Sequence, residues 1–340
     1  MKAPFTYFGG KSTIANLIWD ALGDVKYYLE PFAGSAAVLL QRPDSHTRPN
    51  EIINDKDCYI ANFWRCLKHD PEKTAWWADY PISHADLTAR HHWLIFSEEA
   101  KRLRERILTD PMYCNPQIAG WWVWGISQWI GRGWCLAPKS EARVTVTRPR
   151  PKLNHPMGIH RKSMEFASAK RPTCRHEGIH RLEIESCGES PNLIFRPGLA
   201  EYFGALAQRL ARVVILCGDW QQGFQTPSIL RDNCGIFFDP PYSKEADRDD
   251  DIYRVDDDSV AHSVRDWCTQ HEQECRIVLA GYEGEHDELE RRGWTAISWT
   301  AQGGFANMTK KRGYQNRFRE RLWLSPPCTP VRGLFAAERT

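Results

Sequence analysis

Residues 237–242, Phe-Phe-Asp-Pro-Pro-Tyr, end a short strand that the sequence predicts over residues 234–238. The strand is apolar on both faces and rich in aromatic residues, which is typical of a strand buried inside a sheet. It must stop at Asp239, because two consecutive prolines cannot donate hydrogen bonds to a neighbouring strand. In open α/β sheets, ligands bind beyond the carboxyl ends of the strands. The sequence therefore predicts a binding site at this corner.

The chemistry of the corner points to a class of ligand. Asp239 and the carbonyls of Pro240 and Pro241 are hydrogen-bond acceptors, and Tyr242, which we expect to be exposed, is a flat stacking surface. Together they suit an exocyclic amine on a planar ring. The alternative is a strand that merely ends in a proline turn, and the rest of the chain decides between the two.

Three other acids, Glu30, Asp55 and Asp219, lie where further predicted strands end. With Asp239 they make four acids that converge on one edge of an α/β sheet. An acid after the second strand of such a sheet accepts hydrogen bonds from a ribose. An acid-lined pocket suits a ligand with ribose hydroxyls and a positive charge, and S-adenosylmethionine has both.

Residues 31–35, Pro-Phe-Ala-Gly-Ser, join a predicted strand to a predicted helix. A strand, a tight turn with glycine and a helix N-terminus present free backbone N–H groups to a nucleotide. Near the N-terminus, Gly9 and Gly10 permit close approach of a ligand, and Lys11 is long enough to reach a carboxylate. We expect the following helix to be capped by Ser12 or Thr13. The predicted helices cover residues 12–22, 36–40, 56–68, 199–210, 259–270 and 287–292, with a further basic helix around residues 101–106. The predicted strands cover residues 25–30, 51–55, 213–217, 234–238, 276–280, 294–300 and 319–324.

Composition excludes several classes of protein. The 340-residue chain has a net charge of +2 and no apolar run of about 18 residues, so we expect neither a membrane span nor a membrane partner. The first residues lack the apolar core of a signal peptide. Eleven cysteines without a Cys-x-x-Cys spacing indicate reduced thiols and a cytoplasmic protein. The residues Cys174, His176, His180 and Cys187 do not have the spacing of a zinc site, and we predict no metal.

The segment from about residue 70 to residue 197 has a different character. Nine of the 15 tryptophans lie between Trp64 and Trp134. Residues 101–182 hold 16 Lys/Arg against 5 Asp/Glu, a net +11, which leaves about −9 for the rest of the chain. A basic block with interleaved aromatic residues predicts contact with nucleic acid. The alternative is a solvated surface beside a separate tryptophan core.

Two other segments are predicted to be mobile loops. Residues 245–258 hold eight acids and directly follow the corner, so they are a candidate lid over the site. Residues 302–313 form a basic loop, and the tail from residue 326 is predicted to be flexible.

These motifs and their order resemble the Dam-type DNA adenine methyltransferases, which carry an N-terminal cofactor motif and a recognition insert ahead of the catalytic motif. The resemblance covers residues 4–68 and about 198–325. Asp-Pro-Pro-Tyr is the catalytic motif of enzymes that methylate adenine N6 or cytosine N4, and it matches Asp239, Pro240, Pro241 and Tyr242. The residues that match the family's cofactor motifs are Tyr7, Gly9, Gly10, Lys11, Glu30, Pro31, Phe32, Ala33, Gly34, Ser35, Asp55, Asp219 and Trp220, and Asp239 also faces the cofactor. Residues 317–324 match the family's closing strand. Ala36 stands where many members have a second glycine, and we expect only a slightly altered turn.

The resemblance implies a Rossmann-like, mostly parallel sheet whose last strand is antiparallel. It implies a catalytic domain over residues 1–68 and 198–325, a largely helical and irregular DNA-recognition insert over residues 69–197, and a flexible tail over residues 326–340. It implies that S-adenosylmethionine methylates N6 of an adenine flipped out of double-stranded DNA. Asp239 and the Pro240 carbonyl would then accept the N6 hydrogens, and Tyr242 would stack on the base.

Some alternatives stay open at this point. An RNA or cytosine-N4 methyltransferase has the same chemistry, and a DNA-binding regulator can keep the fold without catalysis. The recognised DNA sequence, the oligomeric state and the order of proton loss and methyl transfer do not follow from the residues. No endonuclease motif stands out, which favours a solitary methylase of a bacterium, phage or prophage over a partner of a restriction enzyme.

Overall fold

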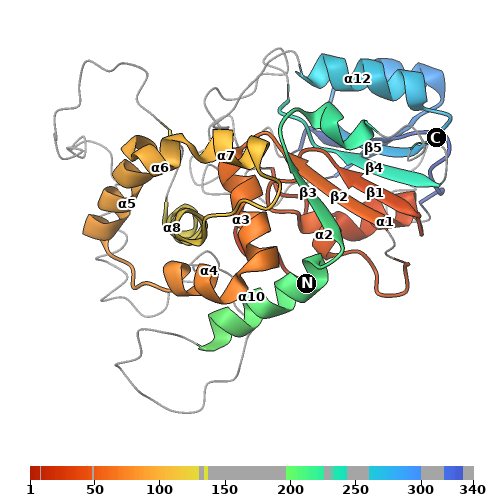
Figure 1. Ribbon diagram of the computed structural model, residues 1–340. Helices are drawn as coiled ribbons and strands as arrows, with labels where there is room; N and C mark the ends of the chain where they lie inside the picture. The colour runs from red at the N-terminus through yellow and green to blue at the C-terminus, as the bar shows by residue number, and fades with distance from the viewer. Residues whose placement is uncertain are drawn as a thin grey trace, which may run out of the picture.

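The computed structural model describes residues 1–7, 9–47, 50–129, 134–136, 197–225, 230, 233–242, 260–299 and 318–331. These residues form one seven-stranded sheet in the order β3-β2-β1-β4-β5-β7-β6 (Figure 1). The strands are β1 (Tyr27–Glu30), β2 (Asn50–Asp55), β3 (Val213–Cys217), β4 (Cys234–Phe238), β5 (Arg276–Tyr282), β6 (Thr295–Ser298) and β7 (Glu320–Leu324). The first five strands are parallel, and β7 runs antiparallel to both of its neighbours. The predicted mostly parallel α/β sheet with an antiparallel closing strand is confirmed.

Both faces of the sheet are covered, as in a doubly wound α/β fold. Along β4, Phe237 packs into one hydrophobic cluster, and its neighbours Ile236 and Phe238 pack into the other. Helix α12 (Val260–His271) covers the second face, and α1 (Ala15–Leu22) belongs to the first (Figure 1). Burial on both sides explains why β4 reads as a continuous apolar run.

The helical part lies beside the sheet (Figure 1). Its elements are α4 (Pro71–Ala78), α5 (His84–Phe96), α6 (Glu98–Lys101), α7 (Leu103–Thr109) and α8 (Pro116–Gln128). Helix α3 (Cys58–His69) packs against α8, and α10 (Pro197–Leu210) packs against α3 and α4. Four of the clustered tryptophans, Trp64, Trp122, Trp124 and Trp134, are buried, so they build core in this part of the molecule.

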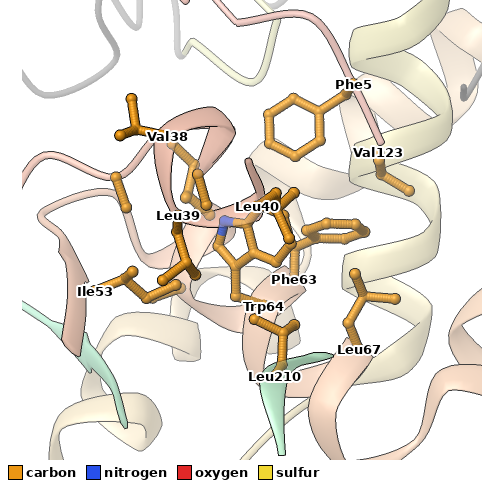
Figure 2. Close-up of a cluster of buried hydrophobic side chains, with 14 of the residues drawn as sticks. Phe5, Val38, Leu39, Leu40, Ile53, Phe63, Trp64, Leu67, Val123 and Leu210 are labelled. Carbon is orange, nitrogen blue, oxygen red and sulfur yellow. The ribbon is translucent and has the colours of Figure 1, made fainter. Parts of the chain in front are cut away.

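One hydrophobic core joins the helical part to the sheet. Phe5 makes edge-to-face contacts with Phe63 of α3 and Trp122 of α8, with ring centroids 5.4 and 5.0 Å apart. Figure 2 shows Phe5, Phe63 and Trp64 close to side chains of α2 (Ala37–Leu40), α8 and α10. The packing is continuous across residues 68 and 69, where the sequence predicts a domain boundary. The division into domains therefore stays a prediction.

Two local predictions are wrong. Helix α1 begins at Ala15 without a side-chain cap, so neither Ser12 nor Thr13 has the predicted role. The chain turns before the helix, with the Ile14 N–H bonded to the Lys11 carbonyl at 3.1 Å, and this turn brings Lys11 into the interior. A flexible tail from residue 326 is wrong for residues 326–331, because the Thr329 N–H bonds the Ala21 carbonyl at 2.8 Å.

Several predictions fall outside the described residues. They are the candidate lid at 245–258, the basic loop at 302–313, the tail beyond 331, the four candidate metal ligands near residue 180 and most of the polar segment from 137 to 196. Within the described ranges, no helix is long and apolar enough to span a membrane.

Candidate active site

A cavity opens at the carboxyl ends of β1, β2 and β4. Its space, including the part open to solvent, is about 900 Å³. The predicted site residues that line it are Tyr7, Gly10, Lys11, Glu30, Pro31, Phe32, Ala33, Gly34, Ser35, Asp55, Asp219, Trp220, Asp239 and Pro241. Gly9, Pro240 and Tyr242 adjoin this set in the chain without lining the cavity. The structure thus brings together segments from four distant parts of the sequence.

The glycine turn after β1 is held from several sides. Gly34 has a φ of +47°, and a Cβ at this position would lie 2.7 Å from Cδ1 of Tyr7. Both the backbone conformation and the lack of space therefore require glycine here. Its N–H donates to Oδ2 of Asp55 at 2.9 Å, and its carbonyl accepts from the indole of Trp64 at 2.9 Å. Trp64 is a supporting residue that the sequence analysis assigned only to a tryptophan cluster.

Ala36 has an unusual backbone conformation for a residue with a side chain. Its φ is +49°, in the left-handed region where a Cβ is unfavourable, and the slightly altered turn stays a prediction. It precedes α2, whose residues Ala37 and Val38 line the cavity. The position therefore has a backbone conformation that favours glycine, although alanine occupies it here.

Glu30 lines the cavity, yet its carboxylate bonds inward. Oε2 accepts from the Tyr28 hydroxyl at 3.0 Å and from the Leu39 N–H at 3.1 Å. Burial raises the pKa of Glu30 to about 8, and the nearby charges of Asp239 and Glu51 add to the shift. These contacts make Glu30 an anchor between β1 and α2, in addition to its place in the cavity wall.

Asp55 and Asp219 organise the rim beside β2 and β3. Asp55 holds the glycine turn through Oδ2, and its Oδ1 accepts from the Asp57 N–H at 2.8 Å. Asp219 is exposed and caps the short helix η2 (Trp220–Phe224) by accepting from the Gln221 N–H at 3.0 Å. Between them, Asn54 donates to the carbonyls of Pro31 at 3.1 Å and of Gly218 at 3.2 Å. This tie across three strand ends was not found from the sequence, because a lone buried amide carries no motif.

The corner after β4 contains a buried ionic cluster of Lys11, Asp239, Tyr242 and Glu320, called the corner cluster below. Nζ of Lys11 contacts both oxygens of Asp239, at 2.8 and 3.0 Å, and the Tyr242 hydroxyl at 2.9 Å. The Tyr242 hydroxyl lies 2.8 Å from Oε2 of Glu320. The expectation that Lys11 reaches a carboxylate is confirmed, and the carboxylate belongs to the predicted catalytic acid.

In the corner cluster, burial shifts the pKa values of the two acids, and the charge of Lys11 offsets only part of the shift. Burial alone would lower the pKa of Lys11, but the charges of Asp239 and Glu320 raise it. Burial raises the pKa of Asp239 and of Glu320, and Lys11 only partly offsets this. Among the described residues, two acids share one cation, so a hydrogen-bond donor that approaches Asp239 is favoured electrostatically.

Tyr242 is not the exposed aromatic that the sequence predicts. It is 6% exposed, and its ring packs edge-to-face on Tyr282 with centroids 4.6 Å apart. The hydroxyl bonds described above hold it in place. A stacking role for Tyr242 therefore stays a prediction.

Glu320 is the member of the corner cluster that the sequence analysis missed. It was counted only as part of the closing strand. Because β7 is antiparallel to β5, the beginning of β7 meets the ends of the parallel strands, and Glu320 pairs with Tyr282. An acid at the start of an antiparallel closing strand was the available clue.

Comparison with known proteins agrees with this geometry. Residues 7–106 match the family model of the D12 class N6 adenine-specific DNA methyltransferases. The matched part contains Lys11, the glycine turn and Asp55, and it ends before Asp239. A search of curated proteins gives no match. The matched segment, which is less than a third of the chain, and the mostly parallel sheet together support an adenine-specific DNA methyltransferase.

Proposed function

We propose that the protein transfers a methyl group from S-adenosylmethionine to N6 of an adenine that has left the DNA duplex. The single observation that carries this proposal is that Asp239 and the glycine turn at Gly34 line the same cavity. A methyl donor held by the turn and an amine held by Asp239 would then be neighbours.

The cavity fits the donor chemically. The carboxylates of Asp55 and Asp239 lie in the walls, which suits a sulfonium and an ammonium group. Asp55 is at the position where an acid accepts hydrogen bonds from a ribose. Phe32 and Trp220 provide flat apolar surfaces, with ring centroids 6.5 Å apart. When bound there, S-adenosylmethionine supplies an electrophilic methyl group.

Asp239 and the Pro240 carbonyl are proposed to accept the two hydrogens of the target amine. This arrangement localises the lone pair on N6 and aims it at the donor. The adenine must leave the duplex, because its amino group is otherwise paired. Positioning of this kind is worth about 7–11 kcal/mol of a reaction barrier.

The DNA is proposed to bind over the basic part of residues 101–182. Arg102, Arg104 and Arg106 are exposed on α7 and at its start. Arg104 donates to the carbonyl of Lys56 at 3.3 Å, and Lys56 lines the cavity. The basic helix therefore lies at the rim of the cavity, where phosphates flanking an extruded base would pass.

Calorimetric titration with S-adenosylmethionine tests the cofactor part of the proposal. The variant Gly34→Ala places a Cβ against Tyr7 and strains a positive φ, so we expect affinity to fall by at least about tenfold. Gly204→Ala in α10 is the matched control, since its Cβ meets nothing within 4 Å, and it should bind as the wild type does. Equal affinity for the wild type and Gly34→Ala would place the donor elsewhere.

Fluorescence of a duplex with 2-aminopurine at the target base tests the capture of the adenine. Extrusion should increase the fluorescence with the wild type, and Tyr242→Ala should weaken the increase because the proposed stacking on the base, worth about 1–3 kcal/mol, is lost. An unchanged increase with Tyr242→Ala would remove Tyr242 from base capture.

A further inference from the structure

The hydrogen bonds of the corner cluster have a direction. The ammonium of Lys11 has three hydrogens, and three acceptors surround it. They are the Gly9 carbonyl at 2.7 Å, the Asp239 carboxylate at 2.8 Å and the Tyr242 hydroxyl oxygen at 2.9 Å. Tyr242 therefore accepts from Lys11 and has one hydrogen left to donate.

Two carboxylates compete for that hydrogen. Oε2 of Glu320 lies 2.8 Å from the Tyr242 hydroxyl, and Oδ1 of Asp239 lies 3.3 Å from it. The shorter distance is near the usual length for an O–H donor and an oxygen acceptor. The Tyr242 hydrogen thus goes to Glu320.

This choice matters for Asp239. A carboxylate has about four lone-pair positions, and Lys11 already contacts both oxygens of Asp239. A hydroxyl hydrogen on Oδ1 would use a further position on the oxygen nearest to it. The acid that must accept the target amine would then have less capacity to do so.

We propose that Glu320 is a positioning residue that holds the Tyr242 hydroxyl away from Asp239 and so keeps Asp239 open as the acceptor of the N6 amine. The proposal rests on the proposed function, and it deepens the assignment of the same site. Glu320 acts through Tyr242.

The position of Glu320 supports a specific role. Glu320 is 6% exposed. Its paired residue on β5 is Tyr282, and the Tyr282 ring packs on the Tyr242 ring. A second buried acid 3.9 Å from Lys11 is not explained by stability, because Asp239 already pairs with that lysine. Among the described residues the buried acids here outnumber the cations, which costs stability, so a role at the site is the better explanation of Glu320.

A double-mutant cycle in methyl transfer tests the proposal. Glu320→Met keeps the side-chain length but removes the acceptor, and we expect kcat to fall roughly 10- to 100-fold with unchanged affinity for S-adenosylmethionine. Tyr242→Phe removes the competing hydroxyl. In the Tyr242→Phe background, Glu320→Met should therefore lower kcat by less than about threefold.

Glu320→Gln provides a second, independent variant. Its amide oxygen still accepts from Tyr242, so we expect kcat within about fivefold of the wild type. The matched control is Glu272→Ala, which removes another buried acid, one that accepts from Arg292 at 2.7 Å and from Trp294 at 2.8 Å. It should lower stability and leave kcat unchanged.

The outcomes separate this proposal from the proposed function. Glu320 does not act through the Tyr242 hydroxyl if Glu320→Met lowers kcat by the same factor in the wild-type and Tyr242→Phe backgrounds. The same conclusion follows if folded Glu320→Gln has a kcat as much as 100-fold below that of the wild type. If the wild type makes no N6-methyladenine, the proposed function fails, and this inference fails with it.

Discussion

The described part of the sheet contains two ionic clusters whose side chains are mostly buried, with Asp24 the exposed member, and they differ in how their charges balance. The amino-end cluster consists of Asp24, Arg42, Glu51 and Arg209. Glu51, near the beginning of β2, bonds Arg42 at 3.2 Å and Arg209 at 2.5 Å, and Asp24 lies 3.5 Å from Arg42. Two acids meet two cations.

The corner cluster lies at the other end of the strands and, in the part of the chain that the structure describes, has two acids for one cation. Asp239 and Glu320 share Lys11, and the pKa values of both acids are raised by burial. The acids of the amino-end cluster form ion pairs with Arg42 and Arg209, whereas Asp239 faces a cavity. A balanced buried cluster holds the fold together, and an unbalanced one beside a cavity is prepared for a ligand.

The largest expected effect comes from breaking the balanced cluster. Glu51→Gln leaves Arg42 and Arg209 without the carboxylate that pairs them, so the free energy of unfolding should fall by about 3–5 kcal/mol. Urea unfolding measures this change. The rate of methyl transfer per folded molecule should stay that of the wild type, and a selective loss of rate would mean that the two clusters are coupled.

The charges of Asp239 in one cluster and Glu51 in the other both raise the pKa of Glu30. Its pKa is raised from 4.5 to about 8, so the folded protein keeps a proton that the unfolded chain has lost. The resulting stability is complete below about pH 4.5 and is lost as the pH rises through about 8. Between about pH 5 and pH 8 the free energy of unfolding should drop by about 2–4 kcal/mol from this residue.

Glu30→Gln tests that pH dependence, because glutamine accepts from Tyr28 and Leu39 without titrating. Unfolding curves across the same pH range should be flatter for the variant. An identical pH slope in the variant and the wild type would show that Glu30 is ionised in the folded protein throughout the range.

Breaking the unbalanced cluster should affect catalysis more than folding. Lys11→Met leaves Asp239 and Glu320 without their cation, and we expect methyl transfer to fall about 100-fold. The pKa of Asp239 should rise further once the attraction of Lys11 is lost, so the remaining activity should climb with pH where the wild type is level. A pH profile parallel to that of the wild type would contradict this account.

The smallest effect concerns the turn that leads to the cavity. Ala36→Gly removes a Cβ from a left-handed position, which offsets the greater freedom of glycine in the unfolded chain. We expect a gain of about 0.5–1 kcal/mol in thermal or urea unfolding. A loss of stability would mean that the Ala36 methyl group makes packing contacts that outweigh the strain.

The parts of the site that could be predicted from sequence are set by neighbouring residues. Pro240 and Pro241 stop β4, so the sequence alone places Asp239 at a strand end. Gly34 and Asp55 follow from the same logic, since a turn or an acid after an apolar run is visible locally.

The remaining parts depend on pairing between distant segments. Glu320 enters the site only because β7 pairs antiparallel with β5, and Tyr242 is buried because Tyr282 and Glu320 cover it. Glu30 turns inward to Tyr28 and Leu39, which no strand pattern reveals.

Nucleoside analysis by mass spectrometry, after incubation of duplex DNA with labelled S-adenosylmethionine, tests the central claim most directly. The wild type should place the label on N6 of adenine. Asp239→Asn should bind the cofactor but reduce the product on the order of 10²- to 10⁴-fold. Label on cytosine with the wild type, or a wild-type rate with Asp239→Asn, would contradict the account.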